Sequence, residues 1–150
     1  MSKRLIKSIA LGVLMLVLFP ISASAQRTGV VNEVAFSHDG ETLTIYVDFE
    51  TYNCLNDNVS LVAYFYNTQG VPLKDFNGQY CSGDGQVSAQ ANITPGYVST
   101  EFDDVEIDIP VSELHLPNGT NYIMFTVRLY AGGAFISNNE GQYNLTVTIN

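Results

Sequence analysis

The sequence predicts an all-β protein, an antiparallel β-sandwich of seven or eight short strands. Apolar and polar residues alternate in several segments with a period of two, which is the pattern of a strand with one buried face. Turn signals rich in Gly, Pro and Asn separate these segments, and no segment has a helical period longer than one turn. This combination is typical of the immunoglobulin-like type of sandwich.

The first 25 residues do not belong to the predicted domain. Basic residues come first, an apolar run follows from residue 9 to residue 19, and Ala23-Ser24-Ala25 matches a small-residue cleavage site. The apolar run is shorter than the roughly 20 residues that span a bilayer. We therefore expect residues 1–25 to be a cleaved signal peptide and residues 26–150 to be a single secreted or periplasmic domain, without stable membrane insertion after cleavage.

The strands follow from the alternation, and the clearest runs from Thr42 to Thr51. There Leu43, Ile45, Val47 and Phe49 point one way while polar residues and Tyr46 point the other way. The turn-rich segment 67–85 predicts short edge strands joined by tight turns. The other predicted strands cover residues 28–36, 59–66, 87–91, 103–109, 121–130 and 142–150.

About ten irregular residues separate the predicted strands 103–109 and 121–130. Pro110 ends the first of them, because proline has no N–H to give to a neighbouring strand. We expect the chain to cross here from one sheet to the facing sheet. Tyr122 is similar in position to the inward tyrosine of fibronectin type III domains, but an inward Tyr122 would place Arg128 in the core. Burying an unpaired guanidinium costs several kcal/mol, so the alternation favours Phe125 inside.

The charge of the chain excludes some partners. Without the signal peptide, three basic residues remain against fifteen acidic ones, a net charge of −12. Such a surface repels nucleic acid phosphates and anionic membranes. We expect no nucleic acid partner, and a protein or glycan partner in the envelope or outside the cell.

Cys54 and Cys81 are the only cysteines of the chain. An even number of cysteines in an exported protein predicts a disulfide. In the chain-entropy account, closing this loop stabilises the fold by roughly 3.5 kcal/mol. We expect Cys54 and Cys81 to form a structural disulfide.

A distinctive order of short motifs runs from Tyr64 to Leu129. The motifs are Tyr64-Phe65-Tyr66, Gly70-Val71-Pro72-Leu73-Lys74-Asp75, Asn77-Gly78-Gln79-Tyr80, Asp84-Gly85-Gln86-Val87, Thr94-Pro95-Gly96-Tyr97, Asp104, Ile109-Pro110, Glu113-Leu114-His115-Leu116 and Gly119. This order resembles that of an uncharacterised family of exported bacterial immunoglobulin-like β-sandwich domains. The resemblance implies a β-sandwich fold and carries no catalytic residues, because its motifs are turn and core residues.

Carboxylates near residue 103 raise the question of a calcium site, since calcium takes several oxygen ligands. Glu101 and Asp103 at the entry of a strand could join Asp84 from a loop. Alternate residues of one strand lie roughly 6.6 Å apart, too far for two ligands of one ion, and no EF-hand loop is present. A solvated acidic face is the favoured interpretation, so we expect no metal or other cofactor.

Tyrosines supply the most specific candidate for a binding surface. Tyr64, Tyr66, Met124 and Tyr130 share an outward face if the strands 59–66 and 121–130 are neighbours. Exposed aromatic rings could then stack on sugars or contact a partner protein. In the alternative interpretation, the segment 67–98 folds back and covers them.

No constellation of residues indicates an enzyme. His38 and His115 have no nucleophile or carboxylate at a recognisable spacing, and no known hydrolase motif is present. We therefore expect a non-enzymatic interaction domain of unknown ligand. Two alternatives stay open: a carbohydrate-binding or adhesion module that uses the tyrosines, and a structural domain that assembles by strand pairing.

Overall fold

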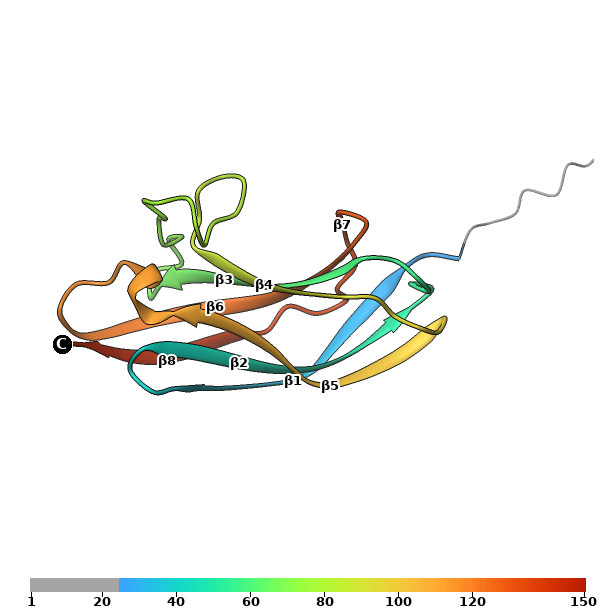
Figure 1. Ribbon diagram of the computed structural model, residues 1–150, viewed down its shortest axis with the longest axis horizontal. Helices are drawn as coiled ribbons and strands as arrows, with labels where there is room; N and C mark the ends of the chain where they lie inside the picture. Colours follow the sequence, from blue (N-terminus) through green and yellow to red (C-terminus); the bar gives the residue numbers. More distant parts are fainter. Residues whose placement is uncertain (1–24) are drawn as a thin grey trace, which may run out of the picture.

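The computed structural model describes residues 25–150 as two facing antiparallel sheets (Figure 1). The first sheet has the order β1-β2-β5, with β1 at Thr28–His38, β2 at Thr42–Tyr52 and β5 at Ser99–Pro110. The second sheet has the order β4-β3-β6, and both β7 and β8 pair with β6. Its strands are β3 (Val59–Asn67), β4 (Ser88–Ile93), β6 (Gly119–Ala131), β7 (Ala134–Phe135) and β8 (Gln142–Ile149). The predicted all-β sandwich is confirmed.

The core lies between the two sheets, where the apolar residues of each alternating strand meet. In β2 every second residue from Leu43 to Thr51 is buried. Phe49, Phe65 and Phe125 are the largest fully buried side chains, and they come from different strands. Burying one such side chain contributes roughly 1.5–3 kcal/mol, so these positions hold the sheets together.

The predicted crossing between sheets is confirmed. β5 ends at Pro110, a short 3-10 helix (η1, Val111–Leu114) follows, and β6 then runs through the other sheet. Val111 and Leu114 are buried, so η1 closes this end of the core. His115 follows η1 in the left-handed conformation, with φ of 51°.

The faces of β6 agree with the predicted alternation. Ile123 and Phe125 are buried, Arg128 points away from the core, and Tyr122 is 67% exposed. The β3–β6 pairing and the β6–β8 pairing, which includes Tyr122, both run without a bulge that could turn Tyr122 inward. The tyrosine-corner arrangement is absent from this position.

Three local features differ from the prediction. A bulge opposite Asp48 leaves both Asp103 and Asp104 exposed, and the Asp48 carboxylate accepts the Asp104 N–H at 2.7 Å. The segment 68–87 makes only isolated bridges to its neighbours instead of edge strands. The strand β7 was not predicted, and the Gly132-Gly133 turn before it has positive φ at both residues.

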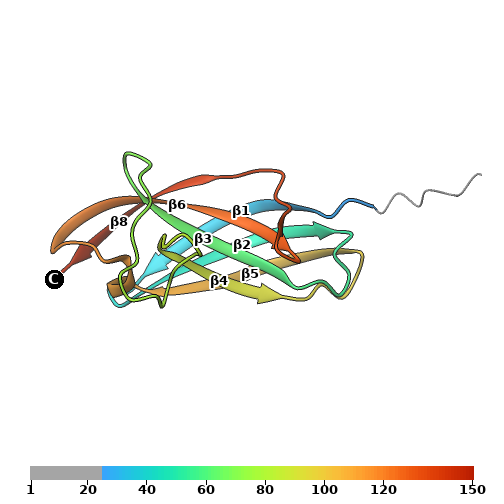
Figure 2. The same ribbon diagram turned by 90° about the horizontal axis from the view of Figure 1, so that it is seen from above.

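The connections give the two sheets different surroundings. The segment 68–87 and the β6–β7 turn both rise from the second sheet on the side away from the first sheet (Figures 1 and 2). The predicted signal peptide at residues 1–25 lies outside the described residues, apart from Ala25. In the described part of the chain, no helix is long and apolar enough to cross a membrane.

Candidate functional site

The outer surface of the second sheet, called here the tyrosine face, carries the predicted aromatic residues. β3 and β6 are neighbours, as the prediction requires, with Tyr64 opposite Thr126 and Tyr66 opposite Met124. Tyr64, Tyr66, Met124 and Tyr130 all point away from the core, and all four are half-buried. The four residues therefore share one face, but none of them is a fully open platform.

A groove of about 350 Å³ lies on the tyrosine face between the segment 68–87 and the β6–β7 turn. Cys81, Ser82 and Gly83 form one wall and Gly133 contributes to the other side. Val62 is largely buried and faces the same groove. We call this the outer groove, and its lining is Ser60, Val62, Tyr64, Cys81, Ser82, Gly83, Ser88, Gln90, Tyr130 and Gly133.

The two tyrosines of the outer groove are held in place by polar contacts. The Tyr64 and Tyr130 hydroxyls are hydrogen-bonded at 3.2 Å, and the Arg128 guanidinium lies 5.2 Å from the centre of the Tyr64 ring. Arg128 also forms an ion pair with Glu140 at 3.2 Å. Burial and the Tyr130 hydrogen bond raise the pKa of Tyr64.

Tyr66 and Met124 belong to a different part of the tyrosine face. Tyr66 lines a second groove of about 290 Å³ together with Gly70, Thr126 and residues 140–142. The Gln142 amide donates to the Met124 sulfur at 2.9 Å. The predicted stripe is thus divided into two grooves, and the segment 67–98 covers part of it without closing it.

Cys54 and Cys81 do not form the predicted disulfide, because both are free thiols. Cys54 is fully buried in the core, and its thiol donates to the Tyr52 carbonyl at 3.3 Å. Cys81 lies in the segment 68–87 and lines the outer groove. Cys54 lies in the core, whereas Cys81 is exposed beside the outer groove, so the fold places the two thiols in different surroundings.

The calcium candidates Glu101, Asp103 and Asp84 are not gathered around one point. Glu101 and Asp103 are exposed on β5 in the first sheet. Asp84 lies in the segment 68–87 beside the second sheet, where its carboxylate accepts the Ser82 hydroxyl. In the described chain, the one group of three ligand side chains within coordinating distance contains none of these residues.

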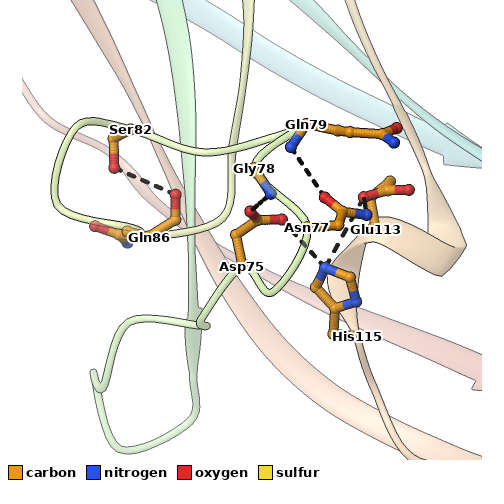
Figure 3. Close-up of polar contacts among 8 residues, drawn as sticks. All are labelled: Asp75, Asn77, Gly78, Gln79, Ser82, Gln86, Glu113 and His115. Atoms are coloured by element: carbon orange, nitrogen blue, oxygen red, sulfur yellow. Dashed lines mark hydrogen bonds and ion pairs between the residues drawn. The ribbon is translucent and has the colours of Figure 1, made fainter.

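That group consists of Asp75, Glu113 and His115, whose ligand atoms lie within 4.8 Å of one another (Figure 3). His115 Nε2 is 3.2 Å from Asp75 Oδ1 and 3.9 Å from Glu113 Oε2. Asp75 comes from the segment 68–87, whereas Glu113 and His115 come from the crossing around η1. The histidine that has no partner in the sequence therefore has two carboxylate neighbours in the structure.

The group is largely shielded from water, and hydrogen bonds hold its carboxylates. The side chains of Asp75, Glu113 and His115 are 3%, 14% and 20% exposed. Asp75 also accepts the Gly78 N–H, and Glu113 accepts the Asn77 side-chain amide at 2.8 Å (Figure 3). Burial raises the pKa of Asp75, but the Gly78 N–H and His115 outweigh it and hold that pKa below its usual value.

Sequence reasoning missed this group for a physical reason. Forty positions separate Asp75 from His115, and only the folding of the segment 68–87 back towards η1 brings them together. The Asn77-Gly78 turn signal indicated where the segment reverses, but not where it lies. Side-chain groups of this kind depend on long-range packing, which no local pattern encodes.

Comparisons with known proteins show only a distant likeness. No family model matches the chain, and no curated protein matches it. Two crystal structures of a β-glucosidase from Kluyveromyces marxianus, one in complex with glucose, overlap 82% of the chain at 10% and 12% identity, with TM-scores of 0.37 and 0.40. The chain corresponds to 14% of the length of that enzyme. The resemblance to an exported bacterial family therefore stays a prediction.

Proposed function

We propose that the protein is an exported, non-enzymatic interaction domain that binds an uncharged polar ligand, a neutral glycan, in the outer groove. The observation that carries this proposal is the lining of the groove. Hydroxyl and amide groups of Ser60, Ser82, Ser88 and Gln90 surround two tyrosines, and no charged side chain lines it. Its volume of about 350 Å³ lies within the usual range for small ligands.

The chemistry of the groove fits sugar better than an ionic ligand. Sugar hydroxyls need several donors and acceptors, and the apolar face of a sugar ring packs on aromatic rings. Tyr130 offers both a ring and a hydroxyl, while Arg128 already occupies one face of the Tyr64 ring. We therefore propose that the sugar ring stacks mainly on Tyr130, and that the hydrogen bond from Tyr64 holds the Tyr130 side chain in position.

Binding to immobilised neutral polysaccharides and envelope polysaccharide tests the proposal. A Tyr130→Ala substitution together with Gln90→Ala should weaken retention at least about tenfold, because an aromatic contact and a hydrogen bond are lost. Tyr122→Ala is the matched control, since Tyr122 is an exposed tyrosine of the same strand outside the groove. Absence of retention on every glycan, or equal retention by the groove variant and the control, would reject glycan binding.

Strand-paired assembly is the second candidate, and the position of β8 favours it. β8 (Gln142–Ile149) pairs on one side with β6 and has no partner strand on the other side among the described residues. An unpaired edge can accept a strand from another chain. Sedimentation at increasing concentration distinguishes the candidates, because assembly requires oligomers. Thr146→Lys, which places a charge at an exposed position of this edge strand, should abolish them while the monomer stays folded.

We also propose the immunoglobulin-like connectivity for this sandwich. In the first sheet, β1, β2 and β5 correspond to strands A, B and E of that fold. In the second sheet, β3, β6 and β8 correspond to strands C, F and G, and β4 extends this sheet beside β3. In this arrangement the segment 68–87 is the connection that leads into the added edge strand β4.

A further inference from the structure

We propose that Asp75, Glu113 and His115 form a binding site for a divalent first-row transition metal ion such as Zn²⁺. The ligand set is one imidazole nitrogen and two carboxylate oxygens, the mixed nitrogen and oxygen set that such ions accept. Calcium and magnesium prefer oxygen ligands alone, so His115 selects against them. This inference is independent of the outer groove and of any ligand bound there.

The distances between the ligand atoms are close to those that one small ion requires. Zn–N and Zn–O bonds of about 2.0–2.2 Å place neighbouring ligands of a tetrahedral ion roughly 3.3–3.6 Å apart. The observed separations from His115 Nε2 are 3.2 Å to Asp75 and 3.9 Å to Glu113. Small side-chain rotations therefore suffice to bring all three atoms onto one ion.

Charge makes the group favourable for a cation. Two carboxylates that are mostly shielded from water face one another, and the only ion-pair partner of either one in the described chain is His115. Removing a carboxylate from water is costly unless a positive charge compensates it. A divalent ion compensates both carboxylates at once, and a neutral imidazole is the form of histidine that coordinates metals.

Hydrogen bonds already orient two of the three ligands. The Gly78 N–H binds Asp75 Oδ2 and leaves Oδ1 directed at His115, and the Asn77 amide holds Glu113 (Figure 3). Outer contacts of this kind fix ligating side chains in metalloproteins. Three protein ligands leave a fourth position for water.

The proposed ion would connect two parts of the chain that the strands leave separate. Asp75 lies on the segment 68–87, which forms one wall of the outer groove, while Glu113 lies in η1 and His115 follows it. Metal binding would therefore anchor the long segment to the crossing between the sheets. It should raise the melting temperature, because the ion binds only the folded chain.

Isothermal titration of the untagged, chelator-treated protein with ZnCl₂ tests the site. We expect saturable binding of one ion per chain and a melting temperature that rises with zinc and returns after chelation. His115→Ala and Glu113→Gln should each weaken zinc binding at least about tenfold, and Asn77→Ala should weaken it by about 10- to 100-fold. Cobalt should give visible absorption bands that disappear in His115→Ala.

His38→Ala is the matched control, since His38 ends β1 as an exposed histidine and does not belong to the group. It should bind zinc as tightly as the wild type. Binding without saturation, or equal affinity in the wild type and in Glu113→Gln, overturns the site. The Glu113→Gln variant preserves the size of the side chain and its contact with Asn77, so this result does not depend on how His115→Ala folds.

Discussion

The outer surfaces of the two sheets follow the same strand pattern but have opposite character. The tyrosine face carries tyrosines, hydroxyls and amides beneath two projecting connections. The outer surface of the first sheet, called here the acidic face, carries carboxylates along its three strands. They are Glu33, Asp48, Glu50, Glu101, Asp103, Asp104, Glu106 and Asp108.

The connections explain the difference. The first sheet has one internal connection, the tight turn between β1 and β2, and the other connections of β2 and β5 lead to the second sheet. The second sheet includes the segment 68–87, which is long enough to fold over its own strands. The outer surface of a sheet therefore has a groove only where a long connection lies over it. Alternating strands without such a connection present only rows of side chains.

The largest effect is expected at Gln86, which anchors the long segment to the tyrosine face. Gln86 is buried, and its amide donates to the Phe65 carbonyl at 3.0 Å. Gln86→Ala should lower the free energy of unfolding by about 1–3 kcal/mol, measured by urea denaturation. On the acidic face, Thr44→Ala removes the exposed hydrogen bond between Thr44 and Asp108. It should change the free energy of unfolding by less than about 0.5 kcal/mol. Equal changes in the free energy of unfolding for Gln86→Ala and Thr44→Ala would contradict the proposed difference between the tyrosine face and the acidic face.

A smaller effect is expected from Tyr64 at high pH. Burial and the Tyr130 hydrogen bond raise the pKa of Tyr64 above its usual value of 10.0 in the folded chain only. The unfolded chain then loses this proton first as the pH rises, so stability is complete below pH 10 and falls above it. Tyr64→Phe should show a shallower loss of stability above pH 10 than the wild type does, in urea titrations at each pH.

Tyr52 gives the matching test on the acidic side. The pKa of Tyr52 is raised chiefly by its hydrogen bond to Glu50, but the tyrosine is exposed. Tyr52→Phe should change the pH dependence in the same direction and by less, because water screens an exposed pair. A larger change for Tyr52 than for Tyr64 would show that burial does not distinguish the two faces.

The smallest effect is expected from a charge reversal on the acidic face. Glu50 and Glu101 are directly opposite each other in the β2–β5 pairing, and like charges there are destabilising. Glu101→Lys should raise the free energy of unfolding by roughly 0.2–1 kcal/mol, and added salt should reduce the gain. Glu106→Lys on the same strand is the control, since it changes the net charge by the same amount and lies opposite Tyr46, not opposite a carboxylate. A similar gain at both positions would mean that net charge, and not the local pair, is responsible.

Prediction from sequence succeeded where one strand contains all the information. The alternation of Leu43, Ile45, Val47 and Phe49 identified β2 and its buried face, and the same reasoning placed Arg128 outside and Phe125 inside. It failed for the cysteines, because composition predicts a disulfide without knowing that Cys54 lies in the core and Cys81 on the surface. It also described His115 as isolated, although Asp75 lies beside it.

The sandwich, its main strands, the buried side of each strand and the crossing at Pro110 can all be predicted from the amino-acid sequence. They follow from periods and turn residues that act between near neighbours in the chain. The folding of the segment 68–87 over β3 and β4, which forms the outer groove and brings Asp75 to Glu113 and His115, is seen in the three-dimensional structure alone. Contacts of this kind join residues far apart in the chain, and the free energy of the whole fold selects them.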